Sequence, residues 1–142
     1  MIFFIPLLFI MAGFIIGLGA VTVIDIHGFL GRHSSYWTEA TTRTHKVTKP
    51  LIWIGMLLFT LGFLLVYRGD LLVVQSIIAL VMIMNGLFLS FKVSPFLLKR
   101  EREGRSQELL PTRLQNQIVV SFILSFISWW GSVVIFVLFL MH

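Results

Sequence analysis

The chain has 142 residues, of which 58% are hydrophobic and only 12% are charged. An average soluble domain is roughly 25% charged, so polar residues are too few here to cover a water-soluble globule, which excludes a soluble enzyme, a nucleic-acid-binding module and a disordered tail. The formal net charge is +5, and the absence of cysteine excludes disulfides and thiol chemistry. We therefore expect an all-α, polytopic integral membrane protein that forms one four-helix transmembrane domain over residues 1–142.

Four apolar segments are long enough to be membrane-spanning helices, which need about 20 apolar residues each. Unsatisfied backbone groups are costly in lipid, so each segment is expected to be helical. The first segment has no Lys or Arg before it and no clear A-x-A cleavage site, so we expect it to be a retained span rather than a signal peptide. The expected spans are about 1–24, 50–67, 71–98 and 117–141.

Small residues form stripes on three of the expected helices, and such residues allow helices to pack closely in lipid. In the first span Gly13 and Gly17 form a GxxxG pair, and in the second Gly55 and Gly62 share one face. We expect these stripes to pack within one bundle; the alternative is that one of them is the face of a homodimer. The fourth span carries the third stripe, at Ser121, Ser125, Ser128 and Ser132.

Basic residues concentrate in two expected loops, 25–49 and 99–117. These loops hold nine Lys and Arg residues, whereas the opposite side has only Arg68. The positive-inside rule therefore places both loops in the cytoplasm and both termini outside, in a multi-pass protein of the plasma (inner) membrane. The expected partners are anionic lipid head groups at the basic loops, and a second copy or another membrane protein; nucleic acid is not an expected partner.

Ionisable groups within a span are functional candidates by default. Lys92 lies near the cytoplasmic end of the third span, with the polar Asn85 seven residues earlier, and Asp25 closes the first span at a similar depth. One interpretation is an ion pair between Lys92 and Asp25. The other is that the Lys92 ammonium reaches the head groups without an acidic partner.

Three histidines, His27, His33 and His45, follow the first span and are candidate cofactor-binding residues. Imidazole is a common ligand of metals and of haem iron, and haem b is the cofactor considered, with His27 as the best axial ligand. The spacing matches no metal motif such as H-E-x-x-H, so no metal site is assigned. The alternative is that the histidines are solvated or bound to head groups. No nucleophile–base pair or phosphate-binding loop predicts a catalytic residue.

Three further features carry local predictions. The stretch 34–49 lacks proline and predicts a polar helix that leads into the second span, while 99–105 predicts a solvated helix extension that breaks at Gly104. Trp129 and Trp130 lie in mid-span, where we expect them to fill space between helices or to face lipid; the alternative is a groove for a planar ligand.

The order of these elements has a counterpart in known proteins. Ile24-Asp25-Ile26-His27 is followed by a polar loop ending in His45-Lys46-Val47-Thr48-Lys49-Pro50, and then by a span with Thr60-Leu61-Gly62. This pattern resembles the small four-span proteins of the copper-resistance-D-like and HemJ-like (protoporphyrinogen oxidase-like) type. HemJ-like enzymes carry a histidine early in the first span and a lysine near the start of the third, positions not matched by His27 and Lys92. The resemblance therefore implies the topology and not the activity.

Three functions are compatible with these residues. The favoured one is a non-enzymatic helical bundle, acting as a scaffold or accessory subunit. The first alternative is a haem- or metal-binding, redox-active membrane protein centred on His27. The second alternative is an oligomeric transporter or channel component that uses Gln75, Asn85 and Lys92.

Overall fold

The computed structural model describes residues 3–141, and every regular element in that range is a helix. Four helical rods of 27 to 34 residues are long and apolar enough to cross a membrane. At 1.5 Å per residue even the shortest is about 40 Å long, against a hydrocarbon core of about 30 Å. The elements are α1 (Phe4–Gly13), η1 (Phe14–Leu18), α2 (Gly19–Leu30), α3 (Ser35–Val66), α4 (Gly69–Phe88), η2 (Leu89–Val93), α5 (Ser94–Arg102) and α6 (Thr112–Leu140).

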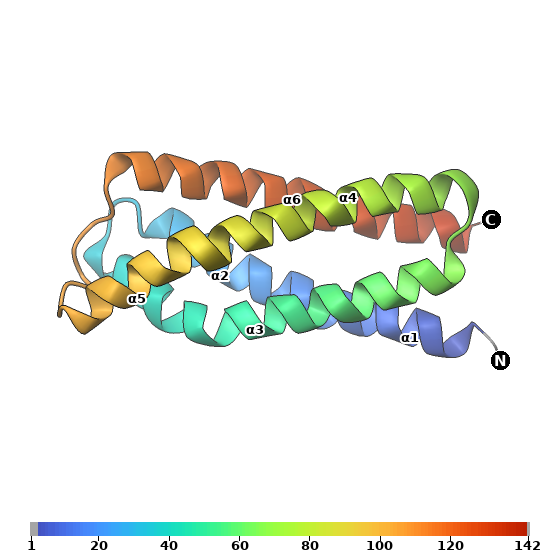
Figure 1. The fold of residues 1–142 in the computed structure, drawn as a ribbon, viewed down its shortest axis with the longest axis horizontal. Helices are drawn as coiled ribbons and strands as arrows, with labels where there is room; N and C mark the ends of the chain where they lie inside the picture. Colours follow the sequence, from blue (N-terminus) through green and yellow to red (C-terminus); the bar gives the residue numbers. More distant parts are fainter. Residues whose placement is uncertain (1–2, 142) are drawn as a thin grey trace.

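The rods are α1–η1–α2, α3, α4–η2–α5 and α6, and they lie side by side with their connections at alternating ends (Figure 1). Because the number of rods is even, the described chain begins and ends at the same end of the bundle. The turn at 31–34 and the loop at 103–111 lie at the opposite end. We call this opposite end the basic end, because most of the lysine and arginine residues lie on it.

Glycines bring the first rod into backbone contact with α3. A Cβ atom added to Gly13 would lie 2.6 Å from the Cβ of Phe59, and one added to Gly62 would lie 2.7 Å from the carbonyl oxygen of Pro6. A Cβ added to Gly55 would collide with the Cα of Gly17. The two glycine stripes expected from the sequence therefore meet each other within one chain, as close backbone packing in lipid requires.

Trp129 of α6 completes this core. Its side chain is only 2% exposed and lies over Gly17, where an added Cβ would overlap the indole ring. The next residue, Trp130, is 47% exposed on the outside of the bundle. The structure therefore gives the two tryptophans the two roles expected from the sequence, one filling space between helices and one on the outer surface.

Polar side chains join α4 to the serine stripe of α6. The Gln75 amide donates to Ser132 Oγ at 2.9 Å, and the Asn85 amide donates to Ser125 Oγ at 3.0 Å and to the Ser121 carbonyl at 3.2 Å. Ser132 donates in turn to the Ser128 carbonyl at 2.8 Å. The serine stripe therefore packs within the chain, against α4.

The helices extend beyond the apolar segments at the basic end. α3 begins after Ser34, whose hydroxyl caps the Trp37 amide, and it continues through Pro50, so the polar stretch expected to be helical is one rod with the second span. α5 carries the third rod to Arg102, and Gly104 follows with φ +70°. The predicted helix break at Gly104 is confirmed, because this backbone conformation favours glycine.

Candidate polar site at the basic end

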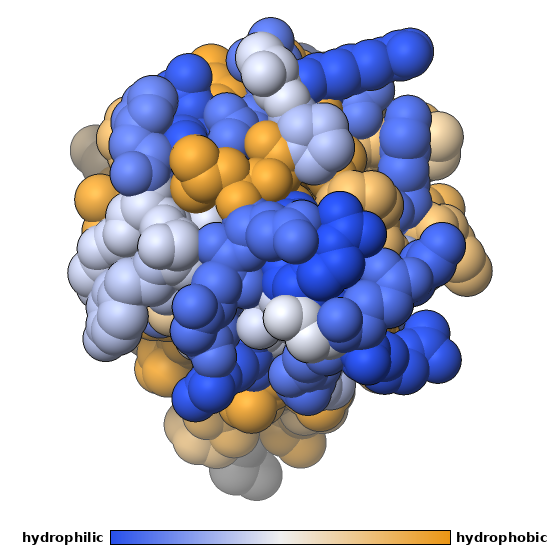
Figure 2. Space-filling model, turned by 90° about the vertical axis from the view of Figure 1, so that its left-hand side faces the viewer, coloured by the Kyte–Doolittle hydropathy of each residue, from blue (hydrophilic) through white to orange (hydrophobic). Residues whose placement is uncertain are grey.

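The basic end carries nine of the eleven lysine and arginine residues, and its surface is mainly hydrophilic around a smaller apolar patch (Figure 2). Several of the cations are paired. Lys46 Nζ of α3 lies 2.6 Å from a Glu101 carboxylate oxygen of α5, and Arg105 contacts Glu108 within the 103–111 loop. Such exposed pairs contribute little stability, so they reduce the free charge at this end without holding the loop or the helices in place.

Beneath this surface lies a cavity of about 70 Å³, lined by α2, α3, the third rod and Ile118 of α6. Its polar lining comes from Asp25 on α2, from three residues of α3, and from Ser90 on η2. The α3 residues are Thr41, His45 and Lys49, spaced four apart and therefore on one face of the helix. The cavity thus collects an acid, a base and a cation at the level where the apolar part of the bundle begins.

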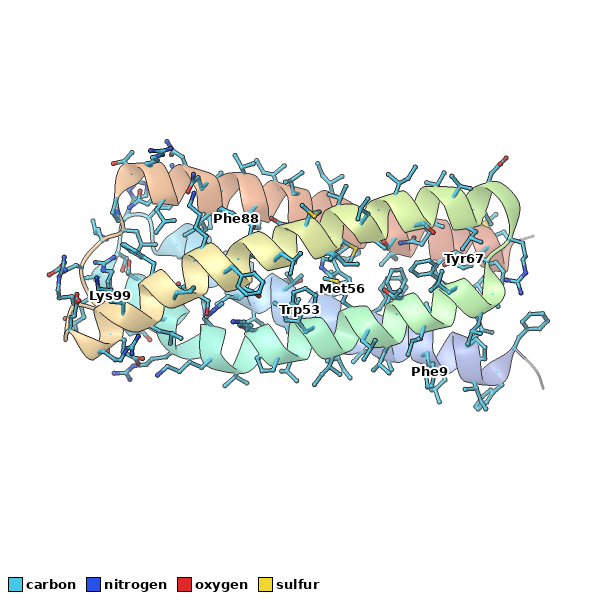
Figure 3. All side chains as sticks on the ribbon, in the orientation of Figure 1. Phe9, Trp53, Met56, Tyr67, Phe88 and Lys99 are labelled. Carbon is cyan, nitrogen blue, oxygen red and sulfur yellow. The ribbon has the colours of Figure 1, made fainter. Side chains whose placement is uncertain are left out.

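The third rod closes the cavity with a π-helical turn, a feature often found at functional sites. Three of the five η2 residues line the cavity, namely Leu89, Ser90 and Val93, and Ser90 also accepts a hydrogen bond from the Trp53 indole at 3.1 Å. Trp53 and Met56 point from α3 toward α4, where they lie against Gly86 (Figure 3). Together these contacts fix the third rod against α3 at this level.

Asp25 faces the cavity without a partner. No hydrogen bond or ion pair engages its carboxylate within residues 3–141. Lys92, the partner considered from the sequence, does not line the cavity. Its ammonium lies 5.6 Å from the centroid of the Phe88 ring, and its side chain is exposed. The ion pair, one of the two interpretations of Lys92, is therefore not formed: Leu89, Ser90 and Val93 are the η2 residues that line the cavity, and Lys92 points elsewhere.

His45 and Lys49 are held differently, although both line the cavity. The Nε2 atom of His45 is buried and has no hydrogen-bond partner in the described chain. Lys49 Nζ donates to Ser94 Oγ at 3.4 Å, a long contact that ties α3 to α5. Buried polar atoms without partners are costly, so the Nε2 atom of His45 is a group that a hydrogen-bonding molecule in the cavity would stabilise.

The other two histidines lie elsewhere. The His27 ring packs on Trp37 with centroids 5.2 Å apart, and its buried Nδ1 has no hydrogen-bond partner among the described residues. His33 is exposed in the turn before α3. Within residues 3–141 no three His, Asp or Glu side chains are grouped so that they could hold a metal ion. The structure thus does not bring His27, His33 and His45 together.

The cavity volume limits its chemistry. At about 30 Å³ per molecule, 70 Å³ holds roughly two waters, which can bridge Asp25, His45 and Lys49. A haem macrocycle does not fit in this space. The arrangement can exchange protons among a carboxylate, an imidazole and water, but it offers no room for an organic substrate.

Sequence reasoning singled out Asp25 and His45 but missed their neighbours Thr41 and Ser90. One signal was available for the α3 residues. Once 34–49 is taken as one helix with the second span, Thr41, His45 and Lys49 recur every four residues and mark a polar stripe on an otherwise apolar rod. Ser90 had no such signal, because its place at the cavity depends on η2.

No family model matches the chain, and neither a curated protein nor a solved structure matches it.

Proposed function

We propose that this chain is an integral membrane protein that crosses the bilayer four times and acts as a non-enzymatic helical bundle, as a scaffold or an accessory subunit of a membrane assembly. The observation that carries the proposal is the distribution of polarity along the rods. Large apolar side chains are exposed on every rod, for example Ile15 at 71%, Leu80 at 60% and Ile127 at 63%. Exposed apolar surface on this scale is typical of a lipid-facing protein.

The charge distribution supports one orientation. Nine cations at one end and Arg68 at the other favour a cytoplasmic basic end, with both termini outside the plasma (inner) membrane. The likeness to copper-resistance-D-like and HemJ-like proteins stays a prediction, and only its four-span topology enters the proposal.

The polar residues within the rods support a structural role over a transport role. Gln75 is fully buried, and it and Asn85 donate their amide hydrogens to the serines of α6. These amides join α4 to α6, which is a structural use of the two side chains. The haem alternative has less support, since the cavity next to His45 is too small for the cofactor and His27 packs against Trp37 instead.

The orientation is testable because the chain has no cysteine. We expect Ser106→Cys, in the loop at the basic end, to react with a membrane-impermeant maleimide only after cells are permeabilised. Asp70→Cys, at the opposite end, is the matched control and should react in intact cells. Labelling of Ser106→Cys in intact cells, or release of the protein by alkaline carbonate, would overturn the proposal.

The non-enzymatic role has a separate test. We expect the purified protein to show no Soret absorption band. A Soret band that is present in the wild type and lost in His27→Ala, but kept in His33→Ala, would replace the scaffold proposal by the haem alternative.

A further inference from the structure

A second hollow lies on the outer surface of the bundle, between α4 and the first half of α6. This groove has a volume of about 730 Å³ and opens to the side of the bundle. Its walls are apolar for most of their length, with Leu80, Met84 and Phe88 on α4 and Val120 and Leu124 on α6. It is about ten times larger than the polar cavity and lies where a bilayer would surround the protein.

The course of the third rod explains why the groove exists. α4 packs on α6, whereas α5 packs on α3, so the rod crosses from one neighbour to the other as it approaches the basic end (Figure 1). The Asn85–Ser125 hydrogen bond holds α4 and α6 together at mid-bundle. Toward the basic end the two rods separate, and the wedge between them is the groove.

Polar residues line two parts of the groove: Asn85 and Ser121 lie in its middle, where they are joined by a hydrogen bond, and the charged lining is confined to the basic end. Arg113, Asn116 and Gln117 of the first turns of α6 lie at the basic end, and Leu124 lies at the far end. From Arg113 to Leu124 α6 rises about 17 Å. That length is close to half of the hydrocarbon core of about 30 Å, so the groove spans about one leaflet and its polar end lies at head-group depth.

Two cations at the polar end have no acidic partner. No hydrogen bond or ion pair engages the Arg113 guanidinium within residues 3–141. The Lys92 ammonium lies 5.6 Å from the ring centroid of Phe88, which lines the groove. α6 also begins here without a side-chain cap, so the positive end of its dipole is directed to the same place. All three features favour an anionic group.

We propose that the groove binds one acyl chain of a phospholipid with an anionic head group, and that Arg113 and Lys92 hold its phosphate. The inference rests on the proposed membrane insertion. A volume of 730 Å³ corresponds to about two dozen units of ~30 Å³, the liquid volume of one water molecule, and because a methylene group is of similar size this is enough for one long chain. A second protein helix in the groove would instead cover Arg113 and require a carboxylate opposite it.

The test is native mass spectrometry of the full chain in detergent, titrated with phosphatidylglycerol or with phosphatidylcholine. We expect one tightly bound phosphatidylglycerol in the wild type. Arg113→Gln and Lys92→Gln should each weaken it about fivefold, the effect of one basic group near a membrane surface. Arg102→Gln is the control and should leave binding unchanged, because Arg102 is an exposed cation of the same end that donates to the Leu98 carbonyl, whereas Lys92 lies over the groove residue Phe88.

A variant that fills the groove tests whether an acyl chain of the lipid binds there. Val120→Trp should remove the lipid adduct by filling the groove. Its matched control is Val134→Trp, because Val120 and Val134 are 57% and 58% exposed on the same helix and only Val120 lines the groove. If circular dichroism shows that Val120→Trp does not fold, Met84→Trp on the opposite wall replaces it.

Three outcomes would overturn the inference: equal affinity for the two lipids, unchanged binding by both groove-filling variants, or a wild-type dimer that a groove-filling variant converts to monomer. The last would show that a second copy occupies the groove. Carbonate extraction and cysteine labelling of the same variants distinguish failure of the lipid site from failure of the proposed membrane insertion. Membrane insertion with unaffected lipid binding rejects only the lipid site, whereas loss of insertion rejects the proposed function as well.

Discussion

The two main helix interfaces of the bundle are built in different ways. Between the first rod and α3, glycines allow backbone atoms to touch, as Gly55 does with Gly17. Between α4 and α6, the rods stay further apart and are joined by side-chain hydrogen bonds such as Gln75 to Ser132. Close backbone packing leaves no space for an added atom, whereas the polar interface tolerates additions and widens into a lateral groove. We therefore expect sequence changes to be penalised unequally at the two interfaces.

The largest change in the free energy of unfolding is expected at the contact between Gly55 of α3 and Gly17 of the first rod. Gly55→Ala adds a methyl group that overlaps backbone atoms of Gly17, which cannot move without separating the rods. We expect a loss of about 3 kcal/mol in the free energy of unfolding, at the upper end for overpacking. Thermal unfolding in detergent, followed by circular dichroism, measures it.

Gly19→Ala is the control for this substitution, because nothing lies within 4 Å of a Cβ placed at Gly19. Alanine is the better helix former, so this variant should be as stable as the wild type or more stable, by up to ~1 kcal/mol. Equal effects at the two positions would show that the close contact is not what stabilises the interface.

A smaller change in the free energy of unfolding is expected at the polar interface between α4 and α6. In a double-mutant cycle of Gln75→Leu and Ser132→Ala, the coupling energy should lie near 1 kcal/mol, since hydrogen bonds between transmembrane helices average ~0.6 and reach ~1.7 kcal/mol. The cycle Ser76→Ala with Ser132→Ala is the control, because Ser76 is exposed. Additive losses in the first cycle would mean that the hydrogen bond between Gln75 and Ser132 does not stabilise the contact of α4 with α6.

Gly131 of α6 lies at the polar interface, opposite α4. A Cβ at Gly131 of α6 would lie 3.9 Å from Ile78 of α4, an ordinary contact. Gly131→Ala should therefore raise the unfolding free energy by up to ~1 kcal/mol through helix propensity. A destabilisation like that of Gly55→Ala would contradict the distinction between the two interfaces.

The smallest effect is expected outside both interfaces, in the 103–111 loop. The hydrogen bond from Arg105 holds the pKa of the Glu108 carboxyl below its usual range. A depressed pKa means that the contribution is present above the unfolded value of about 4.3 and is lost as the pH falls below it. The melting temperatures of Glu108→Gln and the wild type should therefore differ slightly at pH 7, and the difference should shrink as the pH falls below the unfolded value and through the depressed pKa of Glu108. A difference that does not shrink on acidification would exclude this ion pair as its cause.

Parts of the candidate site could be predicted from the sequence and parts could not. The stripe of Thr41, His45 and Lys49 follows from helical spacing once the polar segment and the second span are one helix. The unpaired state of Asp25 does not follow, since it depends on which η2 side chains face α2. The ion pair with Lys92 was plausible by depth alone, but depth does not specify the direction of a side chain around a helix.

The sequence by itself determined four rods, their approximate lengths and the concentration of cations at one end. These follow from local properties, because apolar length and loop charge need no knowledge of which helix neighbours which. Only the tertiary structure decided that the two glycine stripes meet each other, that the serine stripe meets Gln75 and Asn85, and that the third rod crosses from α6 to α3. Those pairings arise from the fit of whole helix surfaces, and residues distant along the chain meet only when the rods are packed.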